Sequence, residues 1–208
     1  MKPNTRQTKK TAKMNNGRID CLLKSNRSIR EFDRSRALAR DELEALIECT
    51  RYCASSANIQ PLKYRAVYKS SEAAAVFSAV RFGGYLPKDS VPAKGNECGS
   101  FIVICLDKSI SQNAERFLID VGIAAQSVTL KATEAGLGGC VMTSFDEAAV
   151  KSALALAEQY KVMAVIALGA PKEHPVIVDA KDDIKYYREN GVHYVPKRTL
   201  SELLIPEE

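Results

Sequence analysis

The sequence lacks most of the residue patterns that indicate metal binding or conventional catalysis. It contains no tryptophan and only two histidines, and its six cysteines include no Cys-x-x-Cys pair. The ligand clusters of a structural zinc site are therefore missing, and we expect reduced thiols and no metal. A Walker A sequence and a Gly-x-Gly-x-x-Gly fingerprint are also absent, so nucleoside triphosphate binding and a Rossmann dinucleotide site lose their main support.

The sequence also lacks long apolar runs. No stretch approaches the roughly 20 apolar residues that span a bilayer, and the N-terminus has no apolar core of a signal peptide. We therefore expect a cytoplasmic protein that does not contact membranes. At 208 residues with 46% hydrophobic content, the chain is long enough for one sizeable core and too short for two ordinary enzyme domains.

The net charge of +5 comes entirely from the first thirteen residues. This segment carries five basic residues and no acidic one, so the remainder of the chain is formally neutral. A basic arm can bind phosphate backbones, but a polar charged segment without apolar spacing is more often disordered. We interpret 1–13 as a disordered arm, expect no nucleic-acid partner, and assign 14–208 to one domain.

Apolar spacing predicts alternating helices and strands. Leu43, Leu46 and Ile47 recur at helical spacing, Pro61 forbids a continued helix, and Asp146 is a good helix N-cap. We predict helices over 40–53, 72–80, 114–135 and 147–157, and strands over 64–68, 101–106, 138–142 and 160–168. The segment 82–99 is rich in turn formers and predicts a long loop, and 172–208 is expected to lie extended over another surface.

The helix predicted over 114–135 is apolar on most faces. It contains no proline and only one glycine, Gly122, and Gly136 follows as its stop signal. A helix that is apolar all round must be enclosed, either by its own domain or by a partner.

Conventional catalytic residues are weakly indicated. A Cys/His nucleophile needs a base beside the cysteine, and both histidines, His174 and His193, lie in segments that read as loops. The paired Asp182 and Asp183 belong to a charged run, for which a solvated face is the simpler interpretation.

Clustered basic residues are the stronger signal. Arg27, Ser28 and Arg30 lie within four residues and offer two guanidinium groups and a hydroxyl to an anion, and Lys197 with Arg198 offers a second cluster. The alternative is that both clusters are ordinary surface charge, and spacing alone favours this alternative.

Five sequence blocks, in order, resemble the nitroreductase family. They are Asn-Arg-Ser-Ile-Arg-Glu-Phe (26–32), Ala-Ser-Ser-Ala-Asn-Ile-Gln-Pro (54–61), Gly-Leu-Gly (136–138), Gly-Ala-Pro (169–171) and the Val-Pro-Lys-Arg ending that opens 195–204. The resemblance covers nearly everything from about Ile19 onward. It implies an α+β, three-layer α/β/α fold with a mostly antiparallel central sheet, and a homodimer with the long helix at its interface.

The resemblance also implies a cofactor and its ligands. FMN would lie between subunits, with NADH or NADPH as electron donor and a small planar acceptor such as a nitroaromatic, quinone or flavin. Arg27, Ser28 and Arg30 would bind the phosphate, ribityl chain and pyrimidine edge. The remaining implied contacts are Lys197 and Arg198 at the phosphate, Ser55, Ser56 and Asn58 from the other subunit, Val141, Met142, Thr143 and Ser144 along the ring, and Phe82 and Tyr85 at the substrate.

The sequence departs from the family pattern at two positions. Asn26 stands where the family has an arginine, which removes one phosphate charge, and Ala54 replaces a proline, which removes rigidity but no ligand atom. No side chain is implied as a catalytic acid or base, and a ping-pong mechanism is expected. Alternatives on the same fold are a flavin reductase, a dehalogenase, a flavin-cleaving enzyme and a flavin-binding protein without turnover.

Overall fold

The computed structural model describes residues 17–86 and 91–206 of the chain. The predicted arm 1–13 lies outside the described residues, as do positions 87–90 of the predicted loop. No helix in the described ranges is long and apolar enough to cross a bilayer.

Four antiparallel strands form the central sheet, in the order β1-β2-β4-β3. They are β1 (Leu62–Val67), β2 (Ser100–Asp107), β3 (Gly138–Met142) and β4 (Tyr160–Gly169). Every residue of β2 is buried, as expected for a continuous apolar run in the middle of a sheet. All four predicted strands are confirmed, with ends that differ by one or two residues.

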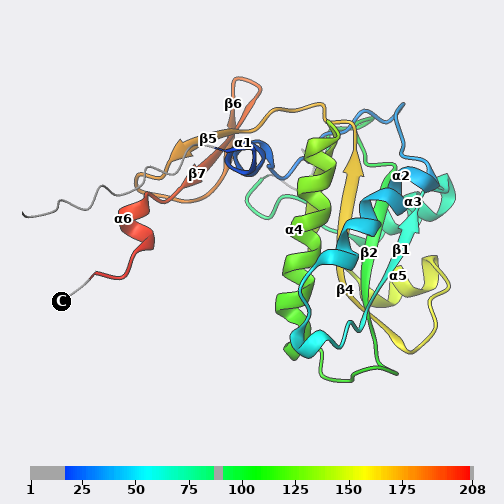
Figure 1. The fold of residues 1–208 in the computed structure, drawn as a ribbon. Coiled ribbons are helices and arrows are strands. Elements are labelled where there is room, and N and C mark those ends of the chain that lie inside the picture. The colour runs from blue at the N-terminus through cyan, green and yellow to red at the C-terminus, as the bar shows by residue number, and fades with distance from the viewer. Residues whose placement is uncertain (1–16, 87–90, 207–208) are drawn as a thin grey trace, which may run out of the picture.

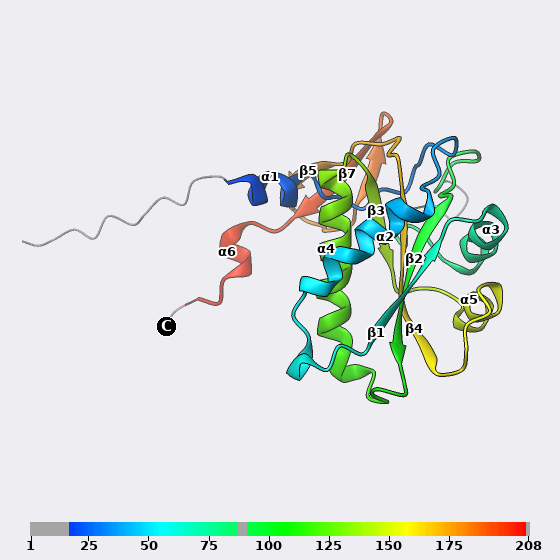
Figure 2. The ribbon, with the colours of Figure 1, turned by 45° about the vertical axis from the view of Figure 1, so that its right-hand side comes forward.

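Helices cover both faces of this sheet (Figures 1 and 2). One face carries α2 (Arg40–Glu48), which continues as the 3₁₀ helix η1 (Cys49–Tyr52), and α4 (Leu118–Glu134), which follows the 3₁₀ turn η3 (Glu115–Phe117). The other face carries α3 (Ser70–Ala79) and α5 (Glu147–Ala153). A mostly antiparallel sheet between two helical layers confirms the predicted α+β, three-layer class.

Each helical layer closes a separate apolar core. Leu43 and Leu46 of α2 pack with Val128 of α4 against one face of the sheet, and Val76 of α3 and Val150 of α5 pack against the other. These side chains are at most 4% exposed. Burial of each contributes about 1.5–3 kcal/mol, so the two cores hold the sheet between the helical layers.

The long helix α4 ends just before Gly136, the predicted stop signal. Gly136 adopts a φ of +74°, which a residue without a side chain adopts at little cost. The Leu137 amide donates to the Ala132 carbonyl at 2.8 Å and the Gly136 amide to that of Thr133 at 3.1 Å, which together form a Schellman cap. At the other end, Leu118 and Ile119 are 57% and 75% exposed, so a single chain does not enclose this helix.

Helix α5 is shorter than predicted. Asp146 caps it as expected and accepts a hydrogen bond from the Ala149 amide at 3.0 Å, but the helix ends at Ala153 and not at 157. Ala155 turns into the left-handed region (φ +48°), and the chain folds back so that Leu156 packs against the core. The sequence has no glycine or proline at this point, so nothing in it indicates that the helix ends before 157.

The C-terminal segment, 172–206, forms a second arm, which projects from the three layers (Figures 1 and 2) and is called the arm below. It contains a small sheet of order β5-β7-β6 and the short helix α6 (Leu200–Leu203). The strands are β5 (Val176–Asp179), β6 (Tyr187–Glu189) and β7 (Val192–Lys197). This sheet and the helix α1 (Arg18–Ser25), which lies near the arm's base, were not predicted.

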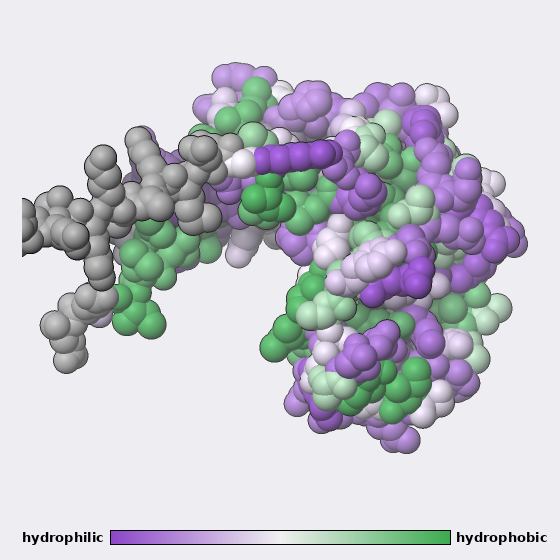
Figure 3. All heavy atoms as spheres, viewed as in Figure 1, coloured by the Kyte–Doolittle hydropathy of each residue, from purple (hydrophilic) through white to green (hydrophobic). Residues whose placement is uncertain are grey.

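Apolar side chains lie exposed at the end of this arm. Leu200, Leu203, Leu204 and Ile205 are 61–91% exposed, and Figure 3 shows them as a green patch around α6. The segment 172–208 was predicted to lie over another surface. Because the arm extends away from the three layers, it does not cover a surface of its own chain there.

Candidate functional site

The first predicted motif, 26–32, is an irregular segment held against β3. The Ile29 amide donates to the Gly139 carbonyl at 2.9 Å, and Ser28 forms a parallel bridge with Gly139. A Cβ on Gly138 would lie 2.6 Å from Cγ1 of Ile29, closer than atoms of a packed core approach. The glycines of the Gly-Leu-Gly block therefore allow the motif to dock on the sheet edge.

Each of the two arginines of this motif has a buried donor atom that is unused within the described part of the chain. Arg27 donates from one terminal nitrogen to the Leu23 carbonyl at 2.8 Å, and burial lowers its pKa from the usual value. Arg30 is only 8% exposed and donates to the Ser28 carbonyl at 3.3 Å. The Nε atoms of both are buried, with no hydrogen-bond partner among the described residues. Buried donors without partners are costly, so this arrangement suits an anionic ligand.

A cavity of about 320 Å³ lies beside this motif. Its lining includes Arg27 and Ile29 from the motif, Thr133 and Gly138 from the end of α4 and the start of β3, and Glu173 from the arm's base. Ser28 is an exposed residue between the two motif residues that line the cavity. The structure thus places Arg27 and Ile29 of the first block at a cavity beside one end of α4, whereas Arg30 is not among the lining residues.

A buried ionic network fixes the motif to the arm. Arg188 of β6 pairs with Glu31 at 2.9 Å and with Glu173 at 2.8 Å, and these two carboxylates are 8% and 10% exposed. Glu173 also accepts the backbone amides of Arg30 and Glu31. The ion pairs of Arg188 with Glu31 and Glu173 were not predicted. No local sequence pattern connects Glu31 with Arg188, which follows it by 157 residues.

His193 was wrongly expected in a loop. It lies in β7, is 2% exposed, and stacks on Tyr186 with ring centroids 5.5 Å apart. Neither ring nitrogen has a hydrogen-bond partner in the described ranges, and Nδ1 lies 3.6 Å from Glu173. The sequence around His193 is short and polar and does not indicate a strand. The inner face of this strand is buried against the ionic network of Arg188, Glu31 and Glu173. His174, by contrast, is exposed outside the strands, and Asp182 and Asp183 are exposed as interpreted.

The second predicted block lies at the start of α4. The Ser56 amide donates to both oxygens of Asp120, at 3.1 and 3.2 Å, and Arg116 donates to the Ser56 hydroxyl at 3.1 Å. The hydroxyl of Ser55 accepts the Gln60 amide at 3.0 Å. These contacts hold Ser55 and Ser56 on the surface beside the start of α4.

The backbone of this block is unusual. Ala57, Asn58 and Gln60 have φ values of +50°, +55° and +52°, conformations that non-glycine residues adopt at a cost. The Asn58 side chain is exposed, and its amide oxygen accepts from Gln60 at 2.9 Å. Three such residues in four positions form a strained loop that presents polar groups outward.

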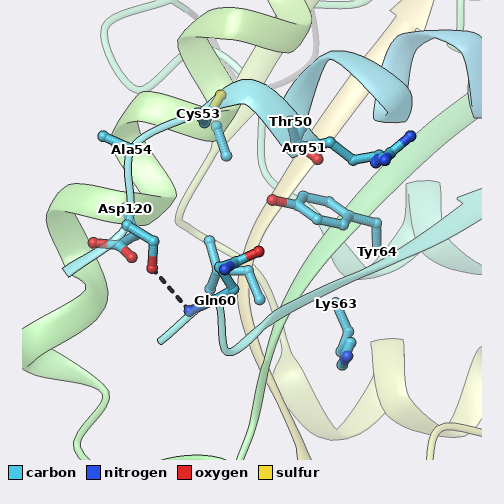
Figure 4. Close-up of a pocket in the computed structure, with 11 residues that line it drawn as sticks. Thr50, Arg51, Cys53, Ala54, Gln60, Lys63, Tyr64 and Asp120 are labelled. Carbon is cyan, nitrogen blue, oxygen red and sulfur yellow. Dashed lines mark hydrogen bonds between the residues drawn. The ribbon is translucent and has the colours of Figure 1, made fainter. Parts of the chain in front are cut away.

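A cavity of about 220 Å³ lies next to this loop. Figure 4 shows its lining side chains, with Thr50 and Cys53 from the end of η1, Asp120 from α4 and Tyr64 from β1. Ser55 also lines it. The cavity therefore belongs to the second block and is separate from the cavity beside Arg27.

The length of α4 separates the two blocks within one chain. Asn26 donates to the Thr133 hydroxyl at 3.1 Å near the C-terminal end of α4, whereas Ser56 binds Asp120 in its first turn. At about 1.5 Å per residue, the helix between Asp120 and Thr133 spans about 20 Å. One chain therefore does not bring Ser55, Ser56 and Asn58 to the arginines.

The C-terminal cations do not line the cavity beside Arg27. Lys197 ends β7 and Arg198 follows it, and both are exposed on the part of the arm that leads away to α6 (Figure 2).

The third predicted group, 141–144, lies at the end of β3. Val141 is 41% exposed, Thr143 and Ser144 are exposed, but the Met142 side chain is 4% exposed and packs in the core. Strand alternation places Met142 on the opposite face from Val141. Only the backbone of Met142 is therefore available to a ligand.

The two predicted aromatic residues lie in different surroundings. Phe82 and Ser144 line a cavity of about 580 Å³ that also includes Phe77, Val80 and Leu86. Tyr85 is 57% exposed and packs instead on Tyr186, with ring centroids 5.2 Å apart. The described residues contain no group of three His, Cys, Asp or Glu side chains that could hold a metal, and their six cysteines are free.

Comparisons with known proteins identify relatives of this architecture. The model of the Nitroreductase family matches residues 23–170. A nitroreductase family protein from Clostridium novyi is 28% identical, with 74% of this chain and 86% of that chain covered and a TM-score of 0.61.

Two further relatives cover more of the chain. A structure in complex with FMN from Desulfovibrio desulfuricans is 20% identical, with 92% of this chain and 98% of that chain covered and a TM-score of 0.68. A protein of Archaeoglobus fulgidus, named as an NADH dehydrogenase/NAD(P)H nitroreductase, is 24% identical over 170 residues, which are 78% of this chain and 92% of that protein.

The ionic network makes a prediction about acid stability. Burial raises the pKa of Glu173, but His193, the Arg30 amide and Arg188 together lower it below its ordinary value of 4.5. Ionised Glu173 therefore stabilises the fold above that pH, and the stabilisation is lost as pH falls through the lower folded pKa. In Glu173→Gln, we expect the free energy of unfolding to decline less steeply between about pH 5 and pH 3.

Urea unfolding across this pH range measures the effect. Glu189→Gln is the matched control, because Glu189 is an exposed carboxylate on the same arm. Parallel stability curves for the wild type and Glu173→Gln would contradict the assignment.

Proposed function

This chain belongs to the nitroreductase family, and we propose that it is an FMN-dependent, homodimeric oxidoreductase that passes electrons from NADH or NADPH to a small planar acceptor. Residues 14–208 form the single FMN-binding domain in this proposal. The FMN complex of the Desulfovibrio desulfuricans relative and the NAD(P)H named for the Archaeoglobus fulgidus relative support the choice of cofactor and donor.

The separation of two motif blocks along α4 is the observation that carries this proposal. A two-fold axis across α4 would run two copies of the helix antiparallel, and the start of one would then face the end of the other. Ser55, Ser56 and Asn58 of one chain would meet Arg27 and Arg30 of its partner. The exposed Leu118 and Ile119 supply apolar surface for such a contact.

The residues of the first block suit an anionic cofactor with a phosphate. Arg27 and Arg30 each keep a buried Nε donor without a partner among the described residues, and Ser28 adds an exposed hydroxyl. Lys197 and Arg198 lie on the projecting arm, so in a dimer they would reach a phosphate bound mainly by the partner. Together these cations offset a phosphate group of roughly −1.5 to −2 charge without the arginine that Asn26 replaces.

The protein's part in the reaction is binding, orientation and electrostatics. FMN, when bound, supplies the hydride and electron chemistry. Arg30 is buried, so its positive charge acts in a region of low dielectric and stabilises negative charge that develops close to it. No side chain is assigned as a catalytic acid or base, and the acceptor is proposed to enter the cavity lined by Phe82 and Ser144.

Reductant titration tests the activity. We expect purified protein reconstituted with FMN to lose its yellow colour anaerobically with NADH or NADPH and to regain it with 1,4-benzoquinone. Initial rates at several quinone concentrations should give parallel double-reciprocal lines, since donor and acceptor use the same site in turn. A protein that fails to bind FMN would refute the proposal, and intersecting lines would refute the ping-pong mechanism.

Mixed dimers test the shared site. Arg27→Ala/Arg30→Ala and Ser55→Ala/Asn58→Ala should each bind FMN poorly, because each removes one side of every site. After the two variants are refolded together in equal amounts, half of the dimers are mixed and each carries one intact site, so about one quarter of sites should recover FMN binding.

Absorbance and fluorescence titration with FMN measure the recovery. Each variant refolded alone is the control. If the mixture binds no more FMN than the two controls, the two residue sets do not form one site across the interface.

A further inference from the structure

Tyr186 lies where three segments of the chain meet. It immediately precedes β6 and is half-buried. It contacts Arg30 of the first motif, Tyr85 of the loop that follows α3, and His193 of β7. No sequence pattern pointed to Tyr186, and the family motif does not include it. Its contacts connect the proposed cofactor side of the site with the loop that follows α3.

The contact with Arg30 is a cation–π interaction. The guanidinium carbon lies 4.5 Å from the centroid of the Tyr186 ring. Arg30 is 8% exposed, so water competes little for its charge, and such interactions are stronger when desolvated. The side chain otherwise makes one hydrogen bond, at 3.3 Å to the Ser28 carbonyl, and therefore depends on the ring for its position.

The contact with the loop uses the hydroxyl of Tyr186 as well as its ring. Its hydroxyl oxygen accepts a hydrogen bond from the Tyr85 amide at 3.3 Å, and the two rings pack with centroids 5.2 Å apart. Phe82, three residues earlier in the same loop, lines the cavity proposed for the acceptor. The hydroxyl and the ring of Tyr186 thus both contact the loop, and the ring also contacts the arginine.

The ring of Tyr186 also packs on a residue of β7. His193 stacks on it at 25° between ring planes, and Arg188, two residues further along, ties the strand to the buried carboxylates Glu31 and Glu173. A residue anchored in this way is suited to orient another side chain.

We propose that Tyr186 is a positioning residue of the flavin site, whose ring orients Arg30 toward the cofactor and whose hydroxyl fixes the loop beside the acceptor cavity. The inference rests on the proposed function and adds to it a residue outside the family motif. It assigns the two parts of one side chain to two different steps, cofactor binding and acceptor binding.

Substitutions that remove each part separately test the proposal in the FMN-loaded protein. In Tyr186→Leu, we expect FMN to bind more weakly by on the order of tenfold, because the cation–π contact is lost. The midpoint potential of bound FMN should fall, since a misplaced Arg30 stabilises the negative charge of the reduced cofactor less. Tyr186→Phe keeps the ring, so FMN affinity should stay within about twofold while the KM for 1,4-benzoquinone rises.

A matched control distinguishes positioning from general packing. Tyr187→Leu removes a neighbouring aromatic ring that stacks on Tyr194 at 5.1 Å, and we expect unchanged FMN affinity and potential. Tyr186→Met provides a second ring-free variant in case the leucine variant does not fold, and circular dichroism checks folding in each.

The outcomes separate this inference from the proposed function. If the wild type binds no FMN, the proposed function fails and the inference fails with it. If the wild type binds FMN but the folded ring-free variants match Tyr187→Leu in affinity and potential, the function stands and Tyr186 is not a positioning residue. An unchanged quinone KM in Tyr186→Phe would overturn the part assigned to the hydroxyl.

Discussion

The rigid length of α4 is the constraint on which the candidate site depends. A helix with a capped end and one face packed in a core does not bend to bring its termini together. Its first turn holds Ser56 through Asp120, and its last turns hold Asn26 through Thr133, about 20 Å away by helical rise. Any single small ligand that needs both residue sets must therefore take them from two chains, and this requirement is the basis of the proposed dimer.

The position of the arginine motif depends on a second set of interactions. Gly138 lets Ile29 approach the sheet, and the carboxylates of Glu31 and Glu173 both pair with Arg188, each with a different terminal nitrogen. Burying two carboxylates is costly unless each is paired and hydrogen-bonded, and here the backbone amides of the motif supply part of that pairing. The motif is thus joined to the C-terminal arm by charge, and its two arginines keep donors for a ligand.

Local patterns in the sequence predicted most of the layers. The apolar run of β2, the spacing of Leu43 and Leu46, and the stop at Gly136 each depend on neighbouring residues, so the strands and helices were found where the structure has them. The end of α5 was missed because Ala155 adopts a positive φ without a glycine to indicate it. His193 was misplaced because its burial depends on residues far away in the chain.

The candidate site was predictable only in part. Its basic residues drew attention because they cluster in the sequence, but only the resemblance implied that they are cofactor ligands, and it added Ser55, Ser56 and Asn58. The contacts of Tyr186 and Arg188 join the motif to residues more than 150 positions later, and no local periodicity records such contacts. Met142 illustrates the reverse case, since strand alternation directs its side chain into the core and leaves only its backbone for the predicted role.

Sedimentation velocity of the FMN-reconstituted protein, followed by both protein and flavin absorbance, tests the shared site most directly. The account predicts that flavin absorbance sediments only with a species of twice the chain mass, with one FMN per chain, and that the monomer formed on dilution releases its flavin. Flavin that sediments with a stable monomer would contradict the account, because one chain would then hold a complete site.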